Sequence, residues 1–228
     1  MRISSALTAL FALGVGALAA PAATAEHEPH LTSISPVFHQ LVAFSLPPEF
    51  KSANATYEKT SGFFYIREHV PQGESVDHWT QMITLTATRD LASNPGATPG
   101  GFAATLAAGF RRHCPDTYAT VELGPETVDA FAGFAVIASC GHVTGGAEAN
   151  SETAIILAVK GTADYYTLQW ARHGPDSHRP LTLDVDYWKK QFDRLRPIKL
   201  CPIVPGEGPP YGSCLGKGDV SAREPAGA

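Results

Sequence analysis

The clearest secondary-structure signal in the chain is the stretch TQMITLTATR, residues 80–89. Four threonines and Met82 lie on one face of this stretch, and Ile83, Leu85 and Ala87 lie on the other. A period of two in residues that are largely β-branched is typical of a half-buried β-strand. We therefore predict a strand here, and the segments on either side decide the fold class.

Further strand-like segments precede and follow this stretch. They cover residues 39–46, 54–58, 63–70, 118–123, 131–140, 153–160 and 164–173. The last two are separated only by Gly161-Thr162-Ala163, which is typical of a compact hairpin turn. Strands that follow one another through short turns pair antiparallel.

A helix is predicted in the middle of the chain. Phe102, Leu106 and Phe110 recur every four residues, which places them on one helical stripe. Thr98 suits the start of this helix, and Pro115 stops it directly after the first cysteine.

A second helix is predicted over residues 180–196, where Val185, Trp188 and Phe192 are spaced by three and four. An antiparallel β-sheet with a mid-chain helix and a C-terminal helix packed on it is an α+β arrangement. We expect a single domain of this class over residues 37–200.

The N-terminus has the pattern of a secretory signal peptide. Residues 1–25 contain one charge, Arg2, an apolar run over residues 6–20 and the small-residue end Ala23-Thr24-Ala25. We predict cleavage after Ala25 and a periplasmic or secreted mature protein without a membrane span. Residues 26–36 are expected to form a loose, flexible N-terminus.

Four cysteines follow the predicted signal peptide: Cys114, Cys140, Cys201 and Cys214. An even number of cysteines in an exported chain favours disulfides. We expect the pairs Cys114–Cys140 and Cys201–Cys214, because these close the shortest loops. The second pair would staple a C-terminal extension, residues 201–228. A Cys-x-x-Cys motif is missing from the sequence, so the usual zinc and redox spacings are missing too.

The composition excludes two classes of protein. Of the 228 residues, 44% are hydrophobic and 17% are charged, and the formal net charge is −5. Disordered chains have low hydrophobicity and high net charge, which is not the pattern found here. A dedicated nucleic-acid binder has a basic footprint, so nucleic acid is not an expected partner.

Two short motifs resemble those of known proteins. The stretch VPQGESVDHWTQMIT, residues 70–84, and the stretch LRPIKLC, residues 195–201, are similar to stretches in small exported bacterial proteins of unknown function. The order of elements over residues 38–201 resembles the Mog1/PsbP-like α/β/α sandwich. The resemblance implies a fold and a compartment, and it transfers no catalytic residue.

Four basic side chains crowd the segment between the last predicted strand and the last helix: Arg172, His173, His178 and Arg179. Cationic side chains near the start of a helix can bind an anion. These residues are therefore a candidate site for a small acidic ligand. The alternative is a solvated turn around Gly174 and Pro175.

Other groups of residues have both a chemical and a structural interpretation. Asp176-Ser177-His178 contains the residue types of a catalytic triad, although neighbours in sequence rarely point at one another. Two further groups contain potential metal ligands: Glu68, His69, Asp77 and His78 around one loop, and His27, Glu28 and His30 near the mature N-terminus. Five aromatic residues could line a ligand face, but we assign them to the core: Tyr65, Trp79, Tyr165, Tyr166 and Trp170.

The common catalytic and cofactor motifs are missing from the sequence. It has no Gly-x-Ser-x-Gly, no His-Glu-x-x-His, no P-loop and no Gly-x-Gly-x-x-Gly. We therefore predict a non-catalytic binding or envelope-accessory module, with an envelope protein or a small acidic ligand as partner and with no metal or cofactor. The alternative is a hydrolase or metal-dependent enzyme whose site is assembled from distant residues.

Overall fold

The structure, a computed structural model, describes residues 31–50, 55–143 and 148–215. The predicted signal peptide, the N-terminal metal-ligand set and residues 216–228 lie outside the described residues. The strands are β1 (Leu31–Val37), β2 (Gln40–Leu46), β3 (Tyr57–Ser61), β4 (Phe64–His69), β5 (Gln81–Thr88), β6 (Tyr118–Val128), β7 (Phe131–Val143), β8 (Asn150–Lys160), β9 (Tyr165–Gly174) and β10 (Lys199–Pro202). The helices are α1 (Pro99–His113) and α2 (Val185–Asp193).

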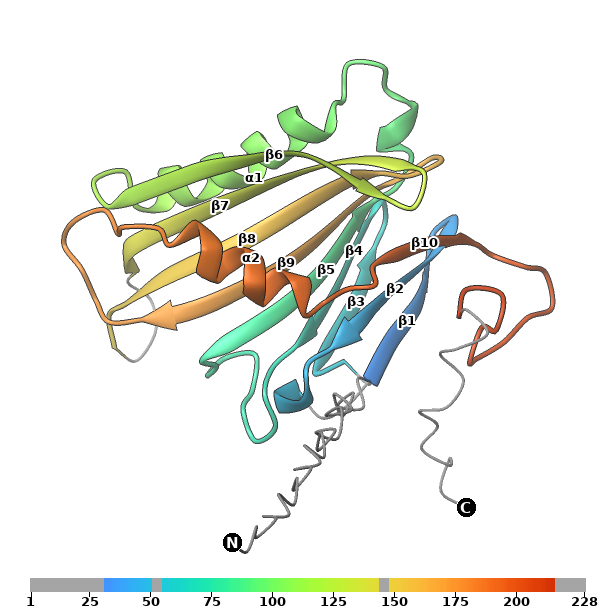
Figure 1. Cartoon of the computed structure of the whole chain (residues 1–228), viewed down its shortest axis with the longest axis horizontal. Helices are drawn as coiled ribbons and strands as arrows, with labels where there is room; N and C mark the ends of the chain where they lie inside the picture. The colour runs from blue at the N-terminus through green and yellow to red at the C-terminus, as the bar shows by residue number, and fades with distance from the viewer. Residues whose placement is uncertain (1–30, 51–54, 144–147, 216–228) are drawn as a thin grey trace, which may run out of the picture.

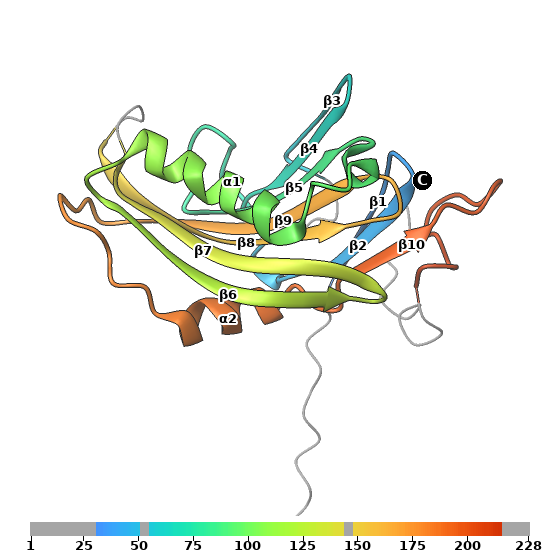
Figure 2. The same cartoon turned by 90° about the horizontal axis from the view of Figure 1, so that it is seen from above.

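Two antiparallel sheets form the framework. The larger has seven strands in the order β3-β4-β5-β9-β8-β7-β6, and the smaller has the order β1-β2-β10. Helix α1 lies on one face of the large sheet, and α2 lies on the opposite face beside the small sheet (Figures 1 and 2). The predicted α+β class, with an antiparallel sheet and two packed helices, is confirmed.

The main core lies between the large sheet and the layer made by α2 and the small sheet. Ile83 and Leu85, which alternate with the threonines of β5, are fully buried in it. At its centre Trp170 has 0% exposure, packs edge-on against Phe50 and donates its indole N–H to Gln81 Oε1 at 3.1 Å. The indole nitrogen is thus satisfied inside an apolar environment.

Helix α1 begins and ends where the sequence predicts. The hydroxyl of Thr98 accepts a hydrogen bond from the amide of Gly101 at 3.1 Å, and Pro99 takes the first helical position. Ala103 and Ala107 are buried against β7 and β8 in one cluster with sheet alanines. Small side chains at this contact let the helix approach the sheet closely, so its larger side chains flank the contact.

Two predicted boundaries are corrected by the structure. Residues 31–36, expected to be irregular, belong to β1, which pairs with β2 in the register Leu31↔Leu46. The strand is hard to read in sequence because Ser33 and Ser35 occupy buried positions. The second helix covers Val185–Asp193 rather than residues 180–196, because the Asp184 carboxylate caps it by accepting from the amide of Tyr187 at 2.9 Å.

Both predicted disulfides are present. Cys114 pairs with Cys140 and Cys201 with Cys214, at Cα–Cα distances of 5.7 and 5.6 Å. Disulfides persist in oxidising compartments, so the pairing indicates that the protein works in an oxidising environment. The predicted boundary between the domain and its C-terminal extension, at residue 201, falls inside β10. Because β10 pairs with β2, the first residues of the extension belong to the small sheet.

A buried carboxylate joins the two sheets. Asp164, with 0% exposure, accepts hydrogen bonds from the amides of His39 and Asp90 at 3.0 and 2.9 Å and from the hydroxyl of Tyr166 at 3.0 Å. Burial acts to raise the pKa of Asp164, but these hydrogen bonds outweigh it and hold the pKa below its ordinary value. The side chain therefore connects the β1–β2 turn to the β8–β9 turn in its charged form.

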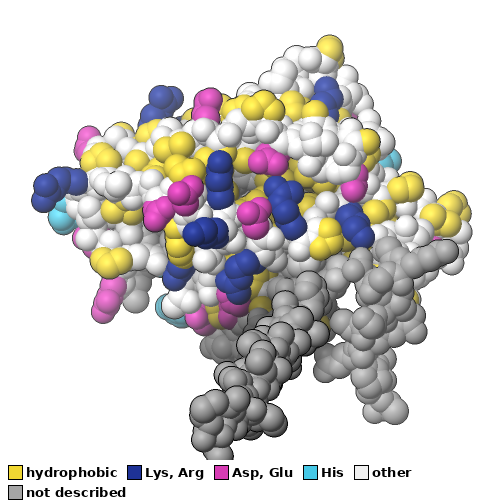
Figure 3. Space-filling model, in the orientation of Figure 1, with side chains coloured by type: hydrophobic (Ala, Val, Ile, Leu, Met, Phe, Trp, Pro, Cys, Tyr) yellow, Lys and Arg dark blue, Asp and Glu magenta, His cyan; other side chains and the backbone are white. Residues whose placement is uncertain are grey.

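The face that carries α2 is evenly charged. Figure 3 shows basic and acidic side chains interspersed across it. The sequence of α2 itself mixes both signs, with Asp186, Lys189, Lys190 and Asp193. Within the described ranges, none of the helices is both long enough and apolar enough to span a bilayer.

Candidate functional site

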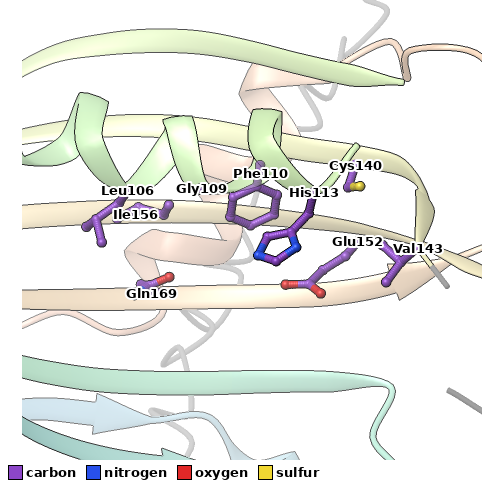
Figure 4. A pocket seen from close by; sticks show the side chains of 9 residues that line it. All are labelled: Leu106, Gly109, Phe110, His113, Cys140, Val143, Glu152, Ile156 and Gln169. Carbon is purple, nitrogen blue, oxygen red and sulfur yellow. The ribbon is translucent and has the colours of Figure 1, made fainter. Parts of the chain in front are cut away.

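A pocket of about 400 Å³ lies between α1 and the large sheet (Figure 4). Its lining residues come from α1, β7, β8 and β9 and are Leu106, Gly109, Phe110, His113, Cys140, Val143, Glu152, Ile156 and Gln169. The volume falls within the range of small-molecule sites, which are mostly apolar with a few convergent polar groups. This pocket is therefore the candidate functional site.

The helical and strand periods together create this lining. Leu106, Gly109, Phe110 and His113 lie three, four and seven positions along α1 and share one stripe of the helix. The alanine stripe of α1, Ala103 and Ala107, packs on β7 and β8. The neighbouring stripe with the larger side chains therefore projects from the helix on the side of β9. The Cys114–Cys140 disulfide closes the end of the pocket, where α1 stops.

Glu152 is the one acidic side chain in the lining. It shares a face of β8 with Ala154 and Ile156, which are both buried under α1. Figure 4 shows its carboxylate pointing into the pocket, as the imidazole of His113 does. Its side chain is 28% exposed, and burial raises the pKa of Glu152 above its ordinary value. The partly buried surroundings of Glu152 thus disfavour the ionised form of its carboxyl group.

The imidazole of His173 does not neutralise this carboxylate. Nε2 of His173 lies 3.9 Å from Oε2 of Glu152, beyond hydrogen-bond distance. Nδ1 of His173 contacts the carbonyl oxygen of Trp79 at 2.9 Å, and since a carbonyl only accepts, Nδ1 holds the proton. Burial lowers the pKa of His173, which favours the neutral ring, whose Nε2 then has no proton to offer Glu152.

The ring of His173 is fixed by stacking as well. It stacks on the indole of Trp79, with ring centroids 3.6 Å apart and the ring planes inclined by 25°. Trp79 in turn packs against the cluster beneath α1. A stacked and hydrogen-bonded ring has little freedom to turn toward Glu152, so the arrangement leaves the carboxylate available to a ligand.

The four basic residues expected to form an anion site are brought together only in part, because Arg172 and His173 line one hollow and His178 and Arg179 do not. Arg172 and His173 are consecutive in β9 and point to opposite faces of the sheet, Arg172 toward Tyr187 on α2 and His173 toward Trp79. His178 lies 3.6 Å from a carboxylate oxygen of Asp176 and has its side chain 79% exposed. Asp176 also lines the hollow that contains Arg172, where its negative charge opposes an anion.

The backbone of Arg179, the fourth of these residues, forms hydrogen bonds within its own loop. Its amide donates to the hydroxyl of Ser177 at 3.3 Å, and that hydroxyl donates to the carbonyl of Arg179 at 2.9 Å. The hydroxyl of Ser177 is therefore committed to backbone and does not bond to His178, as a Ser-His-Asp triad would require.

The potential metal-ligand set around the loop after β4 is divided by the sheet. Glu68 pairs with Thr84, and His69 pairs with Ile83. His69 has 1% exposure and packs against Phe44 in the core, whereas Glu68 lies on the opposite face.

The aromatic residues behave as the core assignment predicted. Four of the five are buried, and their polar atoms bond to protein groups: Tyr65 to Glu58, Tyr165 to the carbonyl of Ala97, Tyr166 to Asp164, and Trp170 to Gln81. Burial and Glu58 together raise the pKa of Tyr65 to about 12. Trp79, which is partly buried, is the member nearest the pocket through its stacking on His173.

Sequence reasoning missed the residues that make the pocket distinctive, namely Glu152, His113 and Gln169. The available signal is in SETAIILAVK, residues 151–160, where Glu152 is the one acidic residue on a strand face that continues with Ala154, Ile156 and Ala158 and ends at Lys160. A single carboxylate on an apolar face needs either a partner or a function.

No protein-family model matches this chain, and no curated protein matches it either.

Proposed function

We propose that the protein is an exported, non-catalytic binding module that holds a small, largely apolar amine in the pocket between α1 and the large sheet. The observation that carries the proposal is the carboxylate of Glu152, which faces a largely apolar pocket and accepts no hydrogen bond from His173, its neighbour at 3.9 Å.

The chemistry of the lining supports a cationic group on the ligand. An ammonium beside Glu152 would supply the positive charge and the hydrogen bonds that its surroundings lack. Phe110 offers a ring face to the same cation, and Leu106, Val143 and Ile156 offer apolar surface to the rest of the ligand. This reverses the ligand charge expected from the four basic residues near the last helix.

Glu152 costs the folded protein stability, which favours a functional interpretation of its position. Because its pKa is raised, the folded state binds a proton more readily than the unfolded state does, and Glu152 disfavours folding above its ordinary pKa. Binding sites commonly contain such unfavourable groups.

The proposal extends to fold family and compartment. The α/β/α layering of α1, the large sheet and α2 supports the Mog1/PsbP-like assignment, and the two disulfides support export through a signal peptide cleaved after Ala25. The second function, a metal-dependent enzyme, is favoured by one observation, the cluster of His142, Asp176 and His178.

The test uses the mature protein and three probes of equal chain length, n-octylammonium, octanoate and n-octanol, with affinities measured by titration calorimetry. We expect octylammonium to bind tightest, and we expect Glu152→Gln to weaken it by about tenfold while leaving octanol unaffected. Glu152→Gln should also raise the melting temperature, which shows that the variant is folded.

Glu122→Gln is the matched control, because Glu122 lies on β6, on the other side of α1, and the substitution removes the same charge. Its affinity for octylammonium should equal that of the unmodified protein. Octanoate binding as tightly as octylammonium, or equal losses in the two variants, would contradict the proposal.

A further inference from the structure

Two segments that are 34 residues apart bring two imidazoles and a carboxylate together at the end of β7. His142 is the second-last residue of β7, and Asp176 and His178 are in the loop between β9 and α2, which passes that end of the sheet in Figure 1. None of the three lines the pocket under α1. We propose that they form a binding site for a divalent transition-metal ion such as Zn²⁺ or Cu²⁺.

Asp176 contacts both imidazole rings. Its Oδ1 lies 2.6 Å from Nδ1 of His142, and its Oδ2 lies 3.6 Å from Nε2 of His178. The ring centroids of the two histidines are 4.7 Å apart, and one ligand atom from each residue falls within 4.8 Å of the others. Ligand atoms about 2.1 Å from a zinc ion lie roughly 3.4 Å from one another, so small side-chain rotations complete the set.

The backbone holds the two segments together independently of these side chains. The amide of Ser177 donates to the carbonyl of Gly141 at 2.9 Å, which joins the loop to β7. The amide of His142 donates to the hydroxyl of Thr117 at 3.1 Å, which holds the end of β7 to the residues before β6. A Cβ atom on Gly141 would lie 2.6 Å from the carbonyl oxygen of Arg179, closer than real contacts allow. The loop thus docks against a strand position that only glycine permits, which fixes His142 and His178 as neighbours.

The donor set selects the class of metal. Imidazole nitrogens suit zinc, copper and nickel, whereas calcium and magnesium prefer oxygen ligands. Three protein ligands leave at least one coordination position for water, since zinc is most often four-coordinate. The ion would take the place now occupied by the proton between His142 and Asp176, because metal ligands bind in deprotonated form.

The test uses the full mature chain without an affinity tag, stripped with EDTA and titrated with ZnCl₂ and separately with CuCl₂. We expect one ion per chain, a higher melting temperature with zinc and a visible absorption band with copper. His178→Ala should weaken binding by at least about tenfold, as loss of one of three ligands requires.

His178→Ala is a safe variant for the fold, because its side chain is largely exposed. His78→Ala is the matched control, an exposed histidine in another loop that should leave the affinity unchanged. Gly141→Ala should weaken binding while all three ligands remain. Equal affinities in the unmodified protein and in a His142→Ala/His178→Ala double variant, or no bound metal at all, would overturn the proposal.

Discussion

Removal of the Cys114–Cys140 disulfide should destabilise the protein by a predictable amount. The bridge closes a loop of 26 residues, and the chain-entropy relation gives about 3.5 kcal/mol for a loop of that length. The Cys201–Cys214 bridge closes a loop of 13 residues, for which the same relation gives about 2.9 kcal/mol. The two bridges should therefore contribute similarly to stability, although they hold different parts of the fold.

Urea unfolding of the Cys114→Ala/Cys140→Ala variant measures this contribution. With a slope of roughly 2–3 kcal/mol/M, a loss of about 3.5 kcal/mol lowers the midpoint by roughly 1–2 M. The Cys201→Ala/Cys214→Ala variant is the comparison, and it should keep octylammonium affinity because only the first bridge closes the pocket. Mass spectrometry confirms that the unmodified protein is oxidised. A loss below about 1 kcal/mol in the first variant would refute the loop-entropy reasoning.

Two further substitutions test the buried polar groups. Asp164→Ala should cost about 3 kcal/mol at neutral pH, since it leaves the amides of His39 and Asp90 without their acceptor, and chemical denaturation measures the loss. Because the pKa of Asp164 is lowered, the difference in unfolding free energy between the two proteins should persist above pH about 4 and shrink as the pH falls further. A difference that stays constant down to pH about 2 would contradict this expectation. Ser35→Ala should raise stability by about 1 kcal/mol, because its buried hydroxyl has no hydrogen-bond partner among the described residues, and a lower melting temperature would count against this.

The parts of the fold that sequence predicts are those with strong local signals. The alternation of β5 and the cap of α1 at Thr98 depend on residues close in sequence, and both are found as predicted. Strand β1 was missed because its inward positions carry Ser33 and Ser35, which imitate a loop in composition. Its place is set by pairing with β2 and not by its own propensity.

The candidate sites depend on contacts that no local pattern encodes. His142 meets Asp176 only because the loop after β9 docks on Gly141. Glu152 faces a pocket only because α1 rests on its alanines and overhangs β9. The four basic residues were grouped by nearness in sequence, and the alternation of β9 then separated Arg172 from His173.

The position of β9 in the large sheet has a consequence for the order of folding. This strand, residues 165–174, lies between β5 and β8, so β5 has no partner on that side until most of the chain exists. The small sheet likewise lacks its third strand until residues 199–202, which form β10, can pair with β2. Strand pairings between segments so distant in sequence slow folding. Until β9 pairs with β5, one edge of β5 has unpaired backbone groups. Completion of both sheets therefore depends on residues 165–202, which are among the last parts of the chain to be made.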